Sequence, residues 1–257
     1  MISMYSITIV HHGRDIVELI GRADVHMHTN ISDGTGTVQQ MLDTAARLGT
    51  LDVIAITDHD RVSASLWAYQ HRHLYPFDII PGTEVTSADG HVLGLWVTEP
   101  IKKGMSLAET TAAIHAQGGI AILAHPFEVT IAPHTLRRYF SQPEGLIPMG
   151  IDAVEVFNAG ALTRGCNWLA QRVFDRVALP QVGNSDAHTP DCIGTGYTRF
   201  RGSTADDLRE SITQGWTTAE GKRWPVITYL KLTRTTIQWN RSVYLETKAP
   251  STRPTLT

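Results

Sequence analysis

The chain has 257 residues, of which 42% are hydrophobic and 18% are charged, and its formal net charge is −3. This apolar fraction is sufficient for a packed core and excludes a wholly disordered chain. A negative net charge disfavours broad, non-specific binding of nucleic acid, because the phosphate backbone attracts basic surfaces. No stretch approaches the roughly 18 consecutive apolar residues of a membrane helix, so we expect no membrane partner.

The N-terminus has no basic segment followed by a long apolar one, so we expect no signal peptide and a cytoplasmic location. Only two cysteines occur, which excludes a disulfide framework. The unusual feature of the composition is its 12 histidines. If they cluster, the chain is suited to metal chemistry with nitrogen and oxygen ligands.

Short apolar runs alternate with helical patterns along most of the chain. The runs have the length and the β-branched content of buried strands, and they lie at 23–28, 51–56, 77–80, 91–97, 119–124, 151–157 and 179–183. The helical patterns lie at 38–45, 106–117, 168–177 and 205–214. Strands that alternate with helices predict a parallel α/β architecture, and seven such units predict a closed (β/α) barrel.

Local signals mark three helix boundaries. Gly49 follows the first helical pattern as a C-terminal stop, and Ser106 and Glu109 form a capping box at the start of the second. Thr204 is a candidate N-cap for the last pattern. These signals favour helices at the positions that the apolar spacing predicts.

We divide the chain into four parts. Residues 1–21 form an N-terminal extension, and residues 22–220 form the barrel domain. Apolar residues then alternate loosely from Trp224 to Leu245, which predicts a β-rich C-terminal extension at 221–247. Residues 248–257 are predicted to be a disordered tail.

The pattern His-x-His occurs twice and is weak evidence alone. His26 and His28 end a predicted strand, where residues two apart share a face and can bind one ion. His71 and His73 fall in a predicted helix, where residues two apart point in different directions. We therefore expect a metal site at the first pair and surface side chains at the second.

Potential metal ligands recur where the predicted strands end. In a (β/α) barrel the functional groups lie at the carboxyl ends of the strands. Nine imidazole or carboxylate side chains occupy these ends or the adjoining loops: His26, His28, Asp33, His59, Glu84, His91, His125, Asp186 and His188. Histidines scattered over a surface would not follow this order, so we predict a metal site at the carboxyl ends of the strands.

The segments around these ligands resemble the motifs of the PHP superfamily, named after polymerase and histidinol phosphatase domains. The matching segments are Asp24-Val25-His26-Met27-His28-Thr29, Thr57-Asp58-His59, Gly82-Thr83-Glu84, Ala124-His125-Pro126 and Ser185-Asp186-Ala187-His188. They follow the order of the family over about residues 22–220, and the stretch after His188 resembles the PHP-associated C-terminal segment. The resemblance implies a distorted seven-stranded (β/α) barrel with two or three metal ions.

Carried over residue by residue, the resemblance implies three ion sites. They consist of His26, His28, Glu84 and Asp186 for the first ion, of Asp33, His59 and His188 for the second, and of Glu84, His91 and His125 for the third. Asp33 stands where some relatives have a histidine. Glu84 would bridge two ions, and we assign the catalytic role to Glu84, Asp186 and His188.

The chemistry of these ligands agrees with that assignment. Imidazole and carboxylate ligands without thiolate suit Zn²⁺, Mn²⁺ or Fe²⁺ better than Mg²⁺ or Ca²⁺. Clustered dications lower the pKa of a bridging water, so the expected nucleophile is a metal-bridging hydroxide. The carboxylates of Asp24, Asp58 and Asp60 could orient the histidine rings from behind. Asp58 could equally be a turn residue.

Candidate substrate-binding residues follow two of the strands. Arg61 lies just after the His59 segment, and Arg164 follows the strand that ends at Asn158. Either arginine could clamp a phosphate with two hydrogen bonds, although each one alone is also typical of a solvated surface. Asn158 is a candidate for the pocket because it ends a strand.

These observations favour a metal-dependent phosphoesterase that hydrolyses small phosphomonoesters such as a nucleotide or sugar phosphate. One alternative is a hydrolase of another bond, either a phosphodiesterase or exonuclease, or an enzyme that cleaves carbamates or carboxylic esters. Another alternative is a metal-stabilised module without turnover. The expected partner is a small phosphorylated substrate, with nucleic acid only as a substrate, and the sequence does not predict the oligomeric state.

Overall fold

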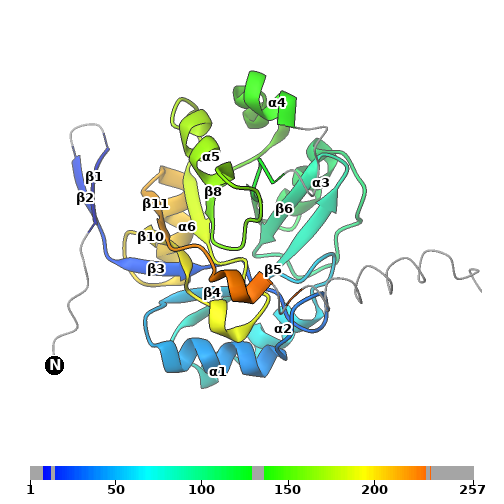
Figure 1. Ribbon diagram of the computed structural model, residues 1–257, viewed down its shortest axis with the longest axis vertical. Coiled ribbons are helices and arrows are strands. Elements are labelled where there is room, and N and C mark those ends of the chain that lie inside the picture. Colours follow the sequence, from blue (N-terminus) through cyan, green and yellow to red (C-terminus); the bar gives the residue numbers. More distant parts are fainter. Residues whose placement is uncertain (1–7, 13–14, 129–135, 230–231, 233–257) are drawn as a thin grey trace, which may run out of the picture.

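The computed structural model describes residues 8–12, 15–128, 136–229 and 232, and its centre is a strongly curved sheet (Figure 1). Nine strands follow one another in the order β11-β10-β3-β4-β5-β6-β7-β8-β9. Their bounds are β3 Gly21–Asp24, β4 Val53–Ile56, β5 Asp78–Ser87, β6 Gly90–Leu95, β7 Ile120–Leu123, β8 Ala153–Asn158, β9 Gln181–Asn184, β10 Gly196–Phe200 and β11 Thr217–Gly221. A separate antiparallel hairpin precedes the sheet and consists of β1 (Thr8–His12) and β2 (Asp15–Leu19).

Helices connect most of these strands. They are α1 Val38–Leu48, α2 Ser63–Gln70, α3 Leu107–His115, α4 Leu136–Ser141, α5 Cys166–Phe174 and α6 Ala205–Gln214, with 3₁₀ turns at Arg72–Leu74, Pro143–Met149 and Pro190–Cys192. The predicted boundary signals are confirmed. Gly49 ends α1 in the left-handed conformation, Ser106 and Glu109 form the capping box of α3, and Thr204 caps α6.

The sheet is mixed and has nine strands, so the prediction of a parallel barrel with seven strands is wrong in these two respects. β5 and β6 are joined by a tight turn at Ala88 and Asp89, and such a short connection requires antiparallel pairing. β7 pairs antiparallel with β6, and β10 and β11 add two antiparallel strands beside β3. Parallel pairs remain at β3–β4, β4–β5, β7–β8 and β8–β9.

The alternation of side chains along β4 shows how the sheet divides the core. Val53 and Ala55 belong to a cluster that also contains residues of α6, whereas Ile54 and Ile56 pack in a cluster with residues of α1 and α2. All four residues are buried. Because both faces of β4 are covered, its sequence is continuously apolar rather than alternating.

Side chains close the sheet between β9 and β10. The hydroxyl of Thr198 on β10 donates to the carbonyl of Gly183 on β9 at 2.9 Å and accepts from the Gly183 N–H at 3.0 Å. The Asn184 side chain accepts from the N–H of Val25 at 2.9 Å. The sheet is therefore a nearly closed barrel, and these side chains join β9 to β10 and to the end of β3 across its seam.

The C-terminal extension differs from the prediction where the structure describes it. Residues 226–229 are helical, although the loose alternation of apolar residues predicts strands there. The buried positions are Trp224, Thr228 and Leu232, and this spacing of four is that of a helix. Residues 233–247 and the tail at 248–257 lie outside the described residues, as do residues 1–7 of the N-terminal extension. The domain boundaries therefore stay a prediction.

No helix in the described ranges combines the length and the apolar character that a membrane span requires.

We predict that Gly196→Ala destabilises the fold, because an added Cβ would overlap the backbone of Asn184 across the seam. Overpacking of this kind costs about 1–3 kcal/mol in the free energy of unfolding. Gly145→Ala is the matched control, since an added Cβ there meets nothing within 4 Å. Urea unfolding should show a lower midpoint for Gly196→Ala alone. Equal midpoints for both variants would contradict the close approach of β9 and β10.

Candidate metal centre

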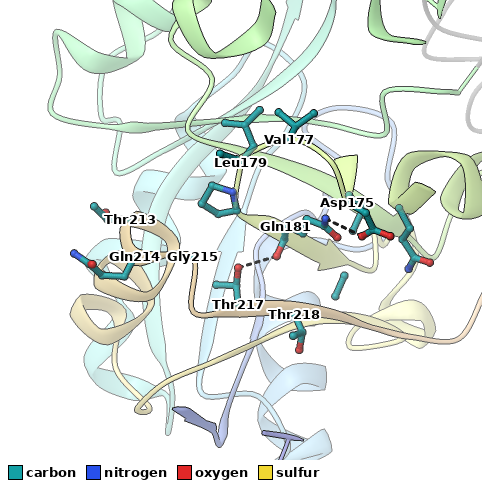
Figure 2. A pocket seen from close by; sticks show the side chains of 14 residues that line it. Asp175, Val177, Leu179, Gln181, Thr213, Gln214, Gly215, Thr217 and Thr218 are labelled. Atoms are coloured by element: carbon teal, nitrogen blue, oxygen red, sulfur yellow. Dashed lines mark hydrogen bonds between the residues drawn. The ribbon is translucent and has the colours of Figure 1, made fainter. Parts of the chain in front are cut away.

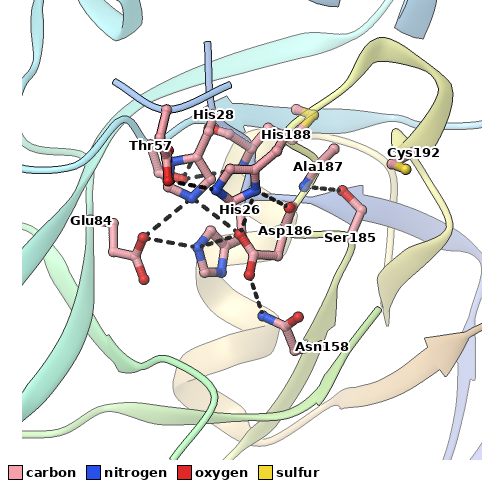
Figure 3. A network of polar contacts seen from close by, with 12 residues as sticks. His26, His28, Thr57, Glu84, Asn158, Ser185, Asp186, Ala187, His188 and Cys192 are labelled. Atoms are coloured by element: carbon pink, nitrogen blue, oxygen red, sulfur yellow. Dashed lines mark hydrogen bonds and ion pairs between the residues drawn. The ribbon is translucent and has the colours of Figure 1, made fainter. Parts of the chain in front are cut away.

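The nine predicted ligands come together at one end of the sheet. His26 and His28 follow β3, His59 follows β4, His125 follows β7, and Asp186 follows β9. Glu84 and His91 instead lie within the paired strands β5 and β6, because β5 runs on past the predicted strand end. Figure 3 shows His26, His28, Glu84, Asp186 and His188 directed toward one another.

Four side-chain atoms converge at the centre of the cluster. The Nε2 atom of His26 lies 3.3 Å from Oε2 of Glu84 and 3.3 Å from Oδ1 of Asp186. The Nε2 atom of His28 lies 3.2 Å and 3.1 Å from the same two oxygens. All four atoms are buried and lack a hydrogen-bond partner. Tetrahedral ligands at about 2.0–2.1 Å from a zinc-sized ion are spaced about 3.3 Å apart, which matches these four distances. By mutual distance, His26 and His28 group with Glu84, and His26 also groups with Asp186 and His125.

A second group gathers around Asp33. Its Oδ2 atom lies 3.1 Å from Nε2 of His188 and 3.7 Å from Nε2 of His59, and Oδ1 lies 3.7 Å from Nδ1 of His28. Asp33, His59, His188 and His28 are close enough to hold one ion together. This group contains the three residues implied for the second ion and adds His28.

Glu84 lies between the groups and contacts five histidines. Oε2 is near His26 and His28, and 3.0 Å from Nδ1 of His59. Oε1 is 2.9 Å from Nδ1 of His91 and 3.0 Å from Nε2 of His125. By mutual distance, His91 groups with His59 and Glu84, and His125 groups with His26 and Asp186. The grouping of His91 with His125 around a third ion therefore stays a prediction.

The acidic neighbours change the proton affinities of these histidines. Burial alone would lower the pKa of His28, but the carboxylates of Asp186 and Glu84 close to its ring raise it to about 10. Burial lowers the pKa of His59 to about 3, and the neighbouring His28 ring acts in the same direction. For Glu84, burial would raise the pKa, but the surrounding histidines hold it well below its usual range. The cluster therefore places ionised carboxylates beside several imidazoles.

The three carboxylates expected behind the rings bond to loops instead. Asp24 accepts from the N–H groups of Ser185 and Gly194 at 3.0 and 2.8 Å. β3 ends at Asp24, and the side chain of Asp24 bonds to the loop after β9 rather than to the ring of His26. Asp58 accepts from Thr29 and Ser32 in the loop that follows β3. Asp60 accepts from the N–H of Thr86 at 2.8 Å, so these contacts shape loops next to the ligands.

Two residues near the ligands are absent from the sequence prediction. Glu155 on β8 is buried and accepts from Nδ1 of His26 at 3.0 Å. Glu155 stands between Val154 and Val156 in the apolar run 151–157, and this position was the available signal, since buried charges need partners. Trp224 places its ring edge-on to His188, with 5.9 Å between the centroids, and its Nε1–H donates to the Ser185 carbonyl. Nothing in the sequence around Trp224 indicated this contact.

The candidate substrate-binding residues lie at different depths. Asn158 is buried and donates from Nδ2 to Oδ2 of Asp186 at 3.1 Å, so it belongs to the wall of the cluster. Arg61 and Arg164 are exposed on the loops that follow β4 and β8. The second His-x-His pair lies away from the cluster: His71 stacks on Trp67 with 4.0 Å between the ring centroids, and His73 is exposed on a 3₁₀ turn.

A cavity of about 570 Å³ opens at the other end of β9 (Figure 2). Its lining comes from the connection of α5 to β9 and from that of α6 to β11, and it includes Asp175, Gln181 and Thr217. Asp186 and His188 follow the carboxyl end of β9, whereas Gln181 begins the strand. The cavity shares no lining residue with the nine ligands, so it is separate from the candidate metal centre.

Comparison with known proteins relates this arrangement to a family. The PHP domain model matches residues 24–141, and the model described as PHP-associated matches residues 165–217. The chain is 29% identical over 149 residues to an uncharacterized protein of Methanocaldococcus jannaschii, covering 54% of this chain and 82% of that protein. It is 33% identical over 82 residues to the phosphoribosyl 1,2-cyclic phosphate 1,2-diphosphodiesterase of Eggerthella lenta, covering 30% of this chain and 31% of that protein.

A solved structure shares the fold. It is that of a two-domain protein from Bacteroides vulgatus, described as containing a predicted PHP-like metal-dependent phosphoesterase. The TM-score is 0.60 at 20% identity, and the match covers 83% of this chain and 70% of that chain. The two family models lie in the order that the motifs predict, on the part of the chain that carries all nine ligands. The chain therefore belongs to the PHP superfamily, with a PHP domain followed by a PHP-associated segment.

Proposed function

We propose that the chain is a metal-dependent phosphoesterase that hydrolyses small phosphomonoesters, such as a nucleotide or sugar phosphate. The observation that carries this proposal is the set of four buried atoms without hydrogen-bond partners, Nε2 of His26 and His28, Oε2 of Glu84 and Oδ1 of Asp186. Buried polar atoms normally have partners, so four of them facing one point indicate a ligand that they share. Two nitrogens and two carboxylate oxygens without thiolate suit Zn²⁺, Mn²⁺ or Fe²⁺.

The side chains of the cluster would have different roles in binding the ions. Glu84 offers its two oxygens to different histidines and would bridge two of the two or three ions. His188 donates from Nδ1 to the carbonyl of Asp186 at 2.8 Å, so in the neutral ring Nε2 would have a lone pair for an ion beside Asp33. Asn158 holds Oδ2 of Asp186, so Oδ1 keeps its direction toward His26 and His28. Bound dications would supply Lewis acidity, both to activate water and to offset charge on a phosphoryl group.

Two other kinds of bond are candidates for cleavage at this site. The partial similarity to a named diphosphodiesterase favours phosphodiesters as the second candidate substrate. Activated water could also attack a carbonyl carbon, so carbamates and carboxylic esters are the third class of candidate substrate. Arg61 and Arg164 are the candidates for binding the substrate phosphate, because a guanidinium can donate two hydrogen bonds to it.

Metal uptake should release protons. In the metal-free chain Glu84 and Asp186 keep a proton on His28, whose pKa is about 10, and an ion binds only the neutral ring. We therefore expect affinity for Zn²⁺ or Mn²⁺ to fall as the pH is lowered from 9 to 6. Calorimetric titrations at pH 7 should give heats that change with the ionisation enthalpy of the buffer, also in the control variant His71→Ala. Heats that are the same in every buffer would contradict this protonation state.

Phosphate release tests the reaction itself. Chelator-treated protein is reloaded with Mn²⁺, Zn²⁺ or Fe²⁺ and offered phosphomonoesters, a dinucleotide phosphodiester and a carboxylic ester. We expect metal-dependent release of phosphate from several monoesters. His59→Ala and Asp186→Ala should each lower turnover at least ~100-fold with the fold preserved, since each removes an ion ligand.

The outcomes separate the candidates. His71→Ala should keep wild-type activity, because His71 lies away from the cluster. Cleavage of the diester alone would replace the monoesterase by a diesterase. Full activity in both His59→Ala and Asp186→Ala would rule out the metal centre as the active site, and bound metal without any turnover would favour a structural module.

A further inference from the structure

The carboxylate of Glu155 accepts four hydrogen bonds. Oε1 accepts from Nδ1 of His26 at 3.0 Å and from Nδ2 of Asn184 at 2.8 Å. Oε2 accepts from the backbone N–H of His125 at 3.0 Å and from Nδ2 of Asn158 at 2.9 Å. An ionised carboxylate offers about four lone-pair directions, so every one of them is used. This explains how the charge can be buried with no lysine or arginine among its hydrogen-bond partners in the described part of the chain.

The four donors come from four different strand ends. His26 follows β3, His125 follows β7, and Asn158 and Asn184 end β8 and β9. The contacts extend one step further, since Oδ1 of Asn184 accepts from the N–H of Val25, and Nδ2 of Asn158 also donates to Asp186. Through these bonds a single carboxylate links the segments that carry His26, His125 and Asp186.

The bond to His26 also determines which ring nitrogen is free. An ionised carboxylate can only accept, so the Nδ1 atom of His26 carries the hydrogen. In the neutral ring Nε2 then has a lone pair, and Nε2 is the atom that faces Glu84 and Asp186 without a hydrogen-bond partner. The opposite tautomer would direct an N–H into the centre of the cluster and prevent ion binding there.

Two of the linked ligands have unusual backbone conformations. His125 has a φ of 27° and Asp186 a φ of 52°, in the left-handed region that residues with a Cβ rarely adopt. Such conformations persist only where surrounding contacts hold them. Glu155 bonds directly to the N–H of His125 and reaches Asp186 through Asn158. By contrast, the buried Asp24 and Asp58 bond to loop groups and to no ligand ring.

We propose that Glu155 is a positioning residue of the metal centre, which fixes the tautomer of His26 and holds His125 and Asp186 in their ion-binding arrangement. This role rests on the part of the proposed function that assigns ions to the cluster. It does not depend on which bond the enzyme cleaves.

The variant Glu155→Gln tests this role in the full-length chain. A glutamine keeps the shape of the Glu155 side chain. Its NH₂ group, however, replaces an oxygen that accepts two hydrogen bonds, so two donors would face another donor. We expect affinity for Zn²⁺ to fall about 10–100-fold, which is typical for the loss of a group that orients a metal-binding histidine. The readout is bound Zn²⁺ per chain by elemental analysis, after equilibration at graded concentrations of free Zn²⁺.

Asp52→Asn is the matched control, because Asp52 also accepts a backbone N–H, that of Arg22 at 2.8 Å, but lies at the opposite end of the strands. If Glu155 had a purely structural role, Glu155→Gln would behave like Asp52→Asn: the melting temperature would fall and the Zn²⁺ affinity would stay unchanged. Wild-type affinity in Glu155→Gln would therefore overturn the proposal.

A measurement on the wild-type chain decides the question if Glu155→Gln does not fold. Nitrogen-15 shifts of the His26 ring in the Zn²⁺-loaded protein should show a protonated Nδ1 and a metal-bound Nε2, and the reverse assignment would overturn the proposal. Neither readout uses a substrate. A chain that binds Zn²⁺ in a Glu155-dependent way but cleaves no ester would therefore refute the proposed reaction and leave the role of Glu155 intact.

Discussion

The dominant constraint on this structure is the cost of removing charge from water. Glu84 is fully buried, and a carboxylate in such a place needs strong partners. It has five histidines around it, which hold its pKa far below the usual range. The same histidines depend on Glu84 and Asp186 for their own partners. The fold must therefore bring many strand ends to one point, or none of these groups could be buried.

The barrel-shaped sheet meets this requirement by supplying one or two ligands from each of several strands. Its interior beneath the ligands is apolar, and a continuous run such as that of β4 contributes to clusters on both faces. At the ligand end, short polar contacts replace apolar packing, with Asp58 shaping the loop at 29–32 and Asn184 connecting β9 to Val25. Rigid strands with polar ends thus place donor atoms more accurately than free loops could.

Most of this arrangement could be predicted from the sequence, because strands and ligands follow local patterns. The apolar runs located the strands from β3 to β9, and the ligands followed from their positions at strand ends. The β5–β6 hairpin was missed because a tight turn changes strand direction without changing apolar spacing. Glu155 and Trp224 were missed for another reason: their importance comes from contacts with residues far away in the chain, His26 and His188.

The claim that the buried cluster is a preorganised ion site can be tested most directly by anomalous diffraction from crystals of the Zn²⁺-loaded protein. We predict a strong peak bounded by Nε2 of His26, Nε2 of His28, Oε2 of Glu84 and Oδ1 of Asp186, with these side chains placed as they are in the metal-free structure. A cluster without such a peak, with its histidines and carboxylates paired only with one another, would contradict it.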